Sequence, residues 1–209
     1  MTDPFPLRLR RALMLLVAFS ALSGCAALSA VSDAATPLDV YEIPAPSGIE
    51  PRARTAPRDV IVETPTTSGA LETDRIMIRP NPLQAQYLPG ARWGEETPVM
   101  LQTLMLRAIE ATGAVRYVGR RPLGPSGDYA IITELTDFQA EQVGEGARVD
   151  IAFLSRIVRE RDAAIIASRT FRGQAVTPST DTLPVVQAFE AASDQALTNF
   201  ALWVRDIVS

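Results

Sequence analysis

The sequence lacks histidine and lysine, and its 209 residues include a single cysteine. All 20 basic residues are therefore arginines. Without histidine there is no Ser-His-Asp triad and no imidazole ligand for a metal ion. Without lysine there is no Schiff-base lysine and no phosphate-binding P-loop. One cysteine cannot form an intramolecular disulfide or a paired-cysteine metal site. We therefore expect a protein that is not an enzyme and that holds no metal ion or dissociable cofactor.

Charge and hydropathy narrow the class further. Hydrophobic residues make up 47% of the chain and charged residues 21%, which is typical of a globular protein with a sizeable core. A chain of this length fits one domain, with two as an alternative. The net charge of −4 argues against a nucleic acid as the partner, because phosphate backbones attract basic surfaces.

The first 24 residues have the pattern of a secretory signal peptide. Arg8, Arg10 and Arg11 form a positive segment, and an apolar run covers residues 12–21. That run is too short to cross a hydrocarbon core, which needs about 20 apolar residues. A short apolar run after a basic segment is typical of a signal peptide that is removed in the mature protein.

The signal peptide ends in Leu22-Ser23-Gly24-Cys25, which resembles a bacterial lipobox. Small residues at 23 and 24 let the signal peptidase approach the backbone. The Cys25 thiol takes a diacylglycerol, and its new amine takes a further acyl chain such as palmitate. The alternative is a buried cysteine in an ordinary signal peptide or anchor helix. The basic segment, the apolar run, the small residues and the only cysteine all favour the lipobox.

Three regions follow from this interpretation. Residues 1–24 are a cleaved signal peptide, residues 25–37 are the lipidated cysteine with a flexible tether, and residues 38–209 are the domain. Ala26 follows the cysteine, and an aspartate there commonly retains lipoproteins in the inner membrane. We therefore expect an outer-membrane lipoprotein that faces the periplasm. Loss of Arg8, Arg10, Arg11 and Asp3 changes the net charge from −4 to −6.

The first half of the domain alternates short β-type runs with breakers. Strands are expected at residues 38–43, 58–63 and 75–79, with a proline-rich loop at residues 44–57. Residues 81–96 are bounded by proline and glycine and are expected to form a loop. Thr97 is expected to cap a helix that contains Pro98 in its first turn and stops at Gly113. A short strand is expected at residues 114–119.

The second half predicts a β-meander and a final helix. Three β-rich runs, at residues 128–142, 148–160 and 164–175, are separated by short polar turns. A helix begins near Pro184, and one stripe of it carries Phe189, Ser193, Ala196, Phe200, Trp203 and Ile207. That stripe packs on the sheet, or alternatively meets a partner helix or a membrane surface. The fold class is α+β, a single domain with the order ββ(β)–α–β–βββ–α, in which two helices cover one face of a largely antiparallel sheet.

The order of these features resembles the ABC-type transport auxiliary lipoprotein family, which includes PqiC-like lipoproteins. Residues 71–76 read Leu-Glu-Thr-Asp-Arg-Ile and resemble the family's run at the entry to a strand. A first strand with Tyr41-Glu42-Ile43 precedes that run. Tyr87 and Trp93 follow it, ahead of a helix that contains Leu101-Gln102 and Leu104. The resemblance covers nearly all of residues 38–207.

The resemblance implies an accessory role in lipid transport between membranes. Family members are similar to subunits of MCE-type systems, in which an inner-membrane ABC permease and ATPase act with MCE-domain proteins that bridge the periplasm. The lipoprotein would dock that bridge at the outer membrane, held there by its lipid anchor. Its implied partners are thus MCE-domain proteins and their ABC permease complex. Self-association of the domain is a further expectation.

Four residues are candidates for partner contact. Asp74 and Arg75 are either a structural pair at a strand entry or part of a partner surface. Tyr87 and Trp93 are either pinned on the core or serve as interface anchors.

The sequence leaves two other functions open. An envelope lipoprotein could itself carry a lipid in a groove between sheet and helices. A hydrolase that uses only carboxylates is a weak alternative, because the adjacent Glu95 and Glu96 cannot lie on both sides of a scissile bond.

Replacement of the lipidated residue, Cys25→Ser, tests the anchor separately from the fold. We expect the variant to be released from membranes on cell fractionation, because two or three acyl chains anchor firmly and none remains. Its circular dichroism spectrum should match that of the unmodified domain. A variant that stays membrane-bound after removal of its signal peptide would contradict the lipobox interpretation.

Overall fold

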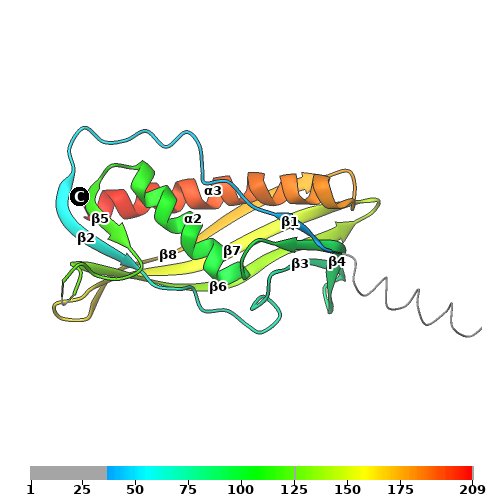
Figure 1. Cartoon of the computed structure of the whole chain (residues 1–209), viewed down its shortest axis with the longest axis horizontal. Coiled ribbons are helices and arrows are strands. Elements are labelled where there is room, and N and C mark those ends of the chain that lie inside the picture. Colours follow the sequence, from blue (N-terminus) through cyan, green and yellow to red (C-terminus); the bar gives the residue numbers. More distant parts are fainter. Residues whose placement is uncertain (1–36, 125, 209) are drawn as a thin grey trace, which may run out of the picture. The chain divides into compact units, whose positions relative to one another are not determined.

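The computed structural model describes residues 37–124 and 126–208, which contain eight strands and two helices (Figure 1). The signal peptide, the lipobox residues Leu22, Ser23 and Gly24, and Cys25 lie outside the described residues. In chain order the elements are β1 (Asp39–Tyr41), β2 (Ala56–Val62), β3 (Arg75–Asn81), β4 (Gln84–Trp93), α2 (Thr97–Ala111), β5 (Val115–Gly119), β6 (Tyr129–Val143), β7 (Gly146–Arg159), β8 (Ala164–Thr177) and α3 (Thr182–Val208).

All eight strands belong to one sheet, and its longest part is the predicted meander. β6, β7 and β8 pair antiparallel along almost their whole lengths. The register places Leu135 beside Phe153 and Phe153 beside Phe171, so one row of large apolar side chains crosses the three strands. The other edge of β6 pairs parallel with β2 and with β3. The sheet is therefore mixed, with its longest ladders antiparallel.

The predicted α+β class and the single domain are confirmed. Both helices lie on the same side of the sheet in Figure 1. α3 packs along β7 and β8, and α2 packs on α3, β2 and β5. No helix in the described part of the chain is long and apolar enough to cross a membrane.

The expected loop at residues 81–96 is wrong, because most of this segment forms β4. β4 folds back on β3 as an antiparallel hairpin and pairs in parallel with β1 on its other side. Pro89 and Gly90 occupy a shift in register between the pairs Met77–Tyr87 and Arg75–Arg92. Gly90 has φ +69° there, a conformation that costs glycine little. The breakers thus mark a bulge within a strand, where proline and glycine are tolerated.

The start of α2 also differs from the expectation. The residue in the N-cap position is Glu96, which makes no side-chain capping bond, and Thr97 is the first helical residue. The backbone N–H and the hydroxyl of Thr97 both donate to the carbonyl oxygen of Thr73, each at 2.9 Å. Thr97 therefore ties the helix to the entry of β3 instead of capping it. The predicted stop is confirmed, since Gly113 has φ +59° and its N–H bonds to the Glu110 carbonyl.

The core lies between the sheet and the two helices. Phe138 and Phe153 from the sheet and Phe189 and Phe200 from α3 are all at most 2% exposed. Of the predicted α3 stripe, Phe189, Ser193, Ala196 and Phe200 are buried, while Trp203 and Ile207 are partly buried against the core. The stripe packs on the sheet, which was the first of the two alternatives.

Gly173 on β8 allows the backbone of α3 to touch the sheet. A Cβ atom at this position would overlap the carbonyl oxygen of Ala192 and lie 2.8 Å from its carbonyl carbon. We expect Gly173→Ala to lower the free energy of unfolding in urea by about 1–3 kcal/mol, because a packed core resists added volume. Gly69→Ala is the matched control, since a Cβ there meets no atom within 4 Å. Equal stability of the two variants would show that α3 can move away from β8 without cost.

Candidate functional site

The β3–β4 hairpin brings together three of the four residues predicted to contact a partner. Asp74 stands directly before β3, Arg75 is the first residue of β3, and Tyr87 lies on β4. The Arg75 guanidinium lies over the Tyr87 ring, 5.8 Å from its centroid, and its Nη2 donates to the Leu88 carbonyl. The Tyr87 hydroxyl donates to the Ala70 carbonyl at 3.1 Å. These contacts fix the Tyr87 ring at the surface, where the residue is 37% exposed.

Trp93 lies in the core, unlike the other three. It is 1% exposed, and its ring meets Phe138 and Phe189 edge to face at centroid distances of 6.0 and 5.2 Å. This arrangement is favourable for aromatic pairs and joins β4 to β6 and α3. Trp93 is therefore a core anchor, and its side chain is not part of the surface of the hairpin.

The run at residues 71–76 is a junction that holds the hairpin to α2. Leu71 and Ile76 are buried at its two ends. Between them, the Thr73 carbonyl accepts both bonds from Thr97, and the Thr73 hydroxyl accepts the N–H of Arg75 at 3.3 Å. The Asp74 carbonyl accepts the N–H of Trp93 at 2.7 Å. Leu71, Thr73 and Ile76 thus have structural roles that do not depend on a ligand.

Arg92 was not predicted from the sequence. Its guanidinium pairs with the Asp74 carboxylate at 3.3 Å, and its main chain lies in register with Arg75. The two arginines would repel each other as neighbours on adjacent strands, and Asp74 offsets that repulsion. Both members of the ion pair are more than a third exposed, so the pair adds little stability. Only the strand register, which the sequence does not show, reveals this partner.

The turn of the hairpin presents one fully exposed leucine. Leu83 is 98% exposed between the two strands. The Asn81 side chain accepts the N–H of Leu83 at 3.1 Å and donates to the Gln84 side chain at 3.1 Å. Arg79 donates to the Pro82 carbonyl at 3.1 Å. Hydrogen bonds within the turn thus hold Leu83 in solvent, where its apolar side chain is accessible to a partner.

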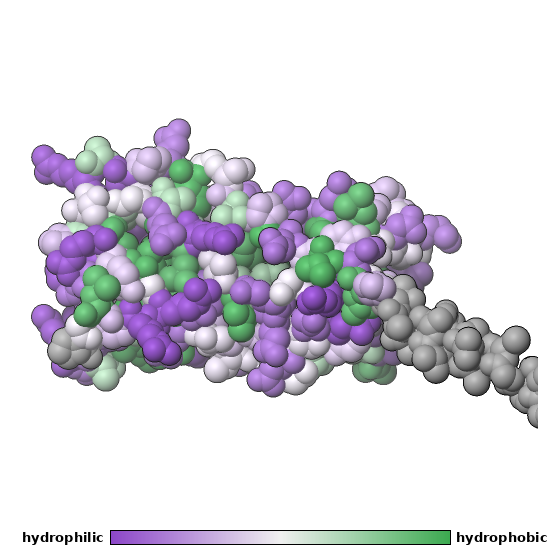
Figure 2. Space-filling model, viewed as in Figure 1, coloured by the Kyte–Doolittle hydropathy of each residue, from purple (hydrophilic) through white to green (hydrophobic). Residues whose placement is uncertain are grey.

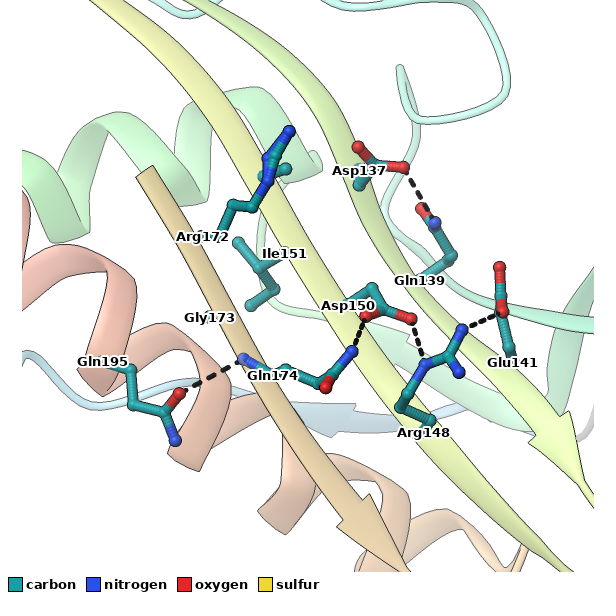
Figure 3. A pocket seen from close by; sticks show the side chains of 11 residues that line it. Asp137, Gln139, Glu141, Arg148, Asp150, Ile151, Arg172, Gly173, Gln174 and Gln195 are labelled. Carbon is teal, nitrogen blue, oxygen red and sulfur yellow. Dashed lines mark hydrogen bonds and ion pairs between the residues drawn. The ribbon is translucent and has the colours of Figure 1, made fainter. Parts of the chain in front are cut away.

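A second surface feature is a hollow of about 520 Å³ that extends over the outward-facing side chains of β6, β7 and β8 (Figure 3). Arg148 donates to Asp150 at 2.8 Å and to Glu141 at 2.6 Å. These two carboxylates, Asp150 first, raise the pKa of Arg148 above its ordinary value. Gln174 donates to Asp150, and Gln139 donates to Asp137 at 3.1 Å. The charged groups of this hollow therefore largely bind one another.

The domain is a mixed sheet with two helices on one side and the β3–β4 hairpin at one end. The chain belongs to the family described as the ABC-type transport auxiliary lipoprotein component, whose model matches residues 41–201. The family resemblance inferred from the sequence is therefore confirmed.

The chain is also similar to two solved structures and to one further protein. A crystal structure of protein XCC0632 from Xanthomonas campestris has 26% identity and a TM-score of 0.71, and the match covers 80% of this chain and 95% of that one. Another crystal structure shares the fold at 16% identity, with a TM-score of 0.62, over 80% of this chain and 99% of that one. A protein of Bradyrhizobium diazoefficiens is 26% identical over 159 residues. The match covers 73% of this chain and only 41% of that relative.

Two substitutions separate the core candidate from the surface candidate. We expect Trp93→Ala to lower the free energy of unfolding by about 3–5 kcal/mol, because it leaves a cavity among aromatic rings. Tyr87→Phe removes only a surface hydroxyl contact and should cost about 0.5–1 kcal/mol. Urea unfolding followed by tryptophan or tyrosine fluorescence measures the Tyr87 variant, and circular dichroism measures both. A Trp93→Ala variant as stable as Tyr87→Phe would contradict the core placement.

Proposed function

We propose that the protein is a non-enzymatic accessory subunit of an MCE-type intermembrane lipid transport system, which docks the transport bridge at the outer membrane. The observation that carries the proposal is the family match over residues 41–201. The lipobox at residues 22–25 and Ala26 support an outer-membrane anchor that faces the periplasm. The ABC permease and its ATPase would be separate chains.

The path of the chain supports the β3–β4 hairpin as the docking surface. β1 begins at Asp39, which lies in register with Ala91 of β4. The tether from Cys25 therefore joins the domain at β1, which pairs with β4 of the hairpin. Its twelve residues, 26–37, reach at most about 40 Å when fully extended. A docking surface on this hairpin therefore stays close to the membrane leaflet that holds the anchor. The bridge must deliver lipid to that leaflet or collect lipid from it.

The character of the hairpin also suits a protein partner. Leu83 provides an apolar anchor, and Tyr87 provides an amphipathic ring braced by Arg75. Aromatic residues and arginine are enriched at interfaces, where a few buried anchors contribute most of the affinity. MCE-domain proteins are the partners that the family implies. The predicted self-association of the domain stays a prediction.

The alternative of a lipid carried between sheet and helices finds less support. A carrier needs an apolar groove of several hundred Å³. In the described residues, large side chains fill the space between sheet and helices, among them Trp93, Phe138, Phe153, Phe189 and Phe200. Hollows such as the one in Figure 3 lie at the surface and have charged linings. Docking explains the same features without an internal lipid.

Chemical crosslinking in cells that express the whole transport system tests the proposal. The lipidated protein, purified through a C-terminal tag, should recover MCE-domain proteins. Leu83→Asp should reduce that recovery about tenfold or more, because a desolvated anchor becomes a charge. Leu123→Asp is the matched control, since Leu123 is also exposed but lies outside the hairpin.

Two results would contradict this account, and they are distinguishable. Recovery of no MCE-domain protein by the unmodified chain would refute the docking function. Equal recovery by the Leu83 and Leu123 variants would leave the function standing but refute the hairpin as its surface.

A further inference from the structure

An arginine-lined hollow lies where β2, β5, β6 and β7 meet, at the end of the domain away from the β3–β4 hairpin (Figure 1). Its volume is about 500 Å³. Four arginines line it, from β2, β5, the end of β7 and the β7–β8 turn: Arg58, Arg116, Arg159 and Arg161. In Figure 2 this end of the molecule carries hydrophilic residues with hydrophobic ones among them.

The charge of this lining differs in sign from that of the protein. Four arginines and two aspartates, Asp59 and Asp128, give it a formal charge of +2. The hollow on β6–β8 carries −1, the one beside Glu42 and Arg107 carries −1, and the one beside Glu190 and Asp194 carries −2. The whole chain has a net charge of −4. Of these four hollows, only this one has a lining with a net positive charge.

Short contacts hold the arginines in place. Arg116 donates two bonds to Asp59, at 2.9 and 2.7 Å, and these bonds raise its pKa. Arg58 contacts Asp128 at 3.4 Å, and the second oxygen of Asp128 accepts the N–H of Asp59 at 2.8 Å. Each guanidinium has five N–H donors, so an ion pair with one carboxylate leaves others available.

The end of β7 and the β7–β8 turn add the remaining two arginines, Arg159 and Arg161. Arg159 donates to Asp162 at 3.0 and 2.8 Å. Arg161 makes no hydrogen bond or ion pair with the residues that the structure describes, although its charge helps to lower the pKa of Asp162. The hydrogen bond from Arg159 is the larger cause of that lowered pKa. Arg161 therefore has the donors of its whole guanidinium available to a ligand.

The floor of the hollow is a close backbone contact. A Cβ atom at Gly127 would lie 2.9 Å from Ile61 Cγ1 and 3.2 Å from the Asp59 carbonyl. The Asp128 N–H donates to that carbonyl at 2.9 Å, and the Glu160 N–H donates to the Asp128 carbonyl at 3.1 Å. These main-chain bonds join β2 to the residue before β6, and that residue to the one after β7. Three of the four arginines, Arg58, Arg116 and Arg159, consequently stand on strands, and Arg161 stands in the turn after β7.

We propose that this hollow binds a phosphate group. Arginine forks match phosphate oxygens with paired hydrogen bonds, and a tetrahedral anion needs donors from several directions. Here the donors come from separate elements around one open space. A planar carboxylate would use fewer of them. The site rests on described residues alone and does not depend on the docking proposal.

Calorimetric titration of the mature full-length chain with inorganic phosphate, at constant ionic strength, tests the site. Saturable binding is expected, with acetate binding more weakly. Arg161→Gln should weaken phosphate binding about tenfold, because it removes charge-assisted hydrogen bonds. Arg172→Gln is the matched control, since Arg172 lines the hollow on β6–β8 and should change binding less than about twofold.

A second arm distinguishes a lipid head group from a soluble phosphate compound. The Cys25→Ser variant, which has no anchor of its own, is mixed with vesicles that contain phosphatidylglycerol. If the protein floats with the vesicles, and if added phosphate and Arg161→Gln each reduce that flotation, the source of the phosphate group is a lipid head group. Phosphate binding without flotation identifies a soluble compound. The proposal fails if phosphate does not saturate, if acetate binds as tightly, or if Arg161→Gln and Arg172→Gln have equal effects.

Discussion

The contact between α3 and the inner face of the sheet is the constraint on which the rest of the domain depends. At Gly173 the absence of a side chain lets the α3 backbone at Ala192 touch β8. Because the helix lies so close, the ring centroid of Phe200 on α3 is 5.8 Å from that of Phe153 and 5.5 Å from that of Phe171. Farther along the helix, Phe189 stacks on Phe138 at 5.2 Å and meets Trp93. A shift of α3 would therefore disturb β4, β6, β7 and β8 together.

This packing also separates the two ends of the domain. The aromatic seam fills the interior, so the two surfaces proposed for binding lie outside it. One end carries the β3–β4 hairpin, which Trp93 fixes to the seam and which presents Leu83 and Tyr87. The opposite end carries the arginine-lined hollow, whose strands continue from the same sheet. A proposed partner surface at one end of the domain and a proposed anion site at the other suit the accessory role proposed above.

Local patterns predicted the elements that depend on near neighbours in the chain. Period-two alternation and short turns defined the meander, and Pro98 and Gly113 marked α2, because these signals act over a few residues. β4 was missed because Pro89 and Gly90 have the same local preference in a bulge as in a loop. The parallel pairs of β2 and β3 with β6 were missed because they join segments about 60–70 residues apart in the chain. The ion pair of Arg92 and the clustering of the four arginines in the hollow were missed for the same reason. These side chains come close to their neighbours only through the register of the strands.

The central claim is that this lipoprotein docks an MCE-type bridge through its β3–β4 hairpin. Photo-crosslinking in living cells tests it most directly, with a photoreactive residue placed at position 83 in one strain and at position 123 in another. The account predicts a crosslinked product between position 83 and an MCE-domain protein, and none from position 123. Crosslinks from position 123 alone, or no crosslink to an MCE-domain protein from either position, would contradict it.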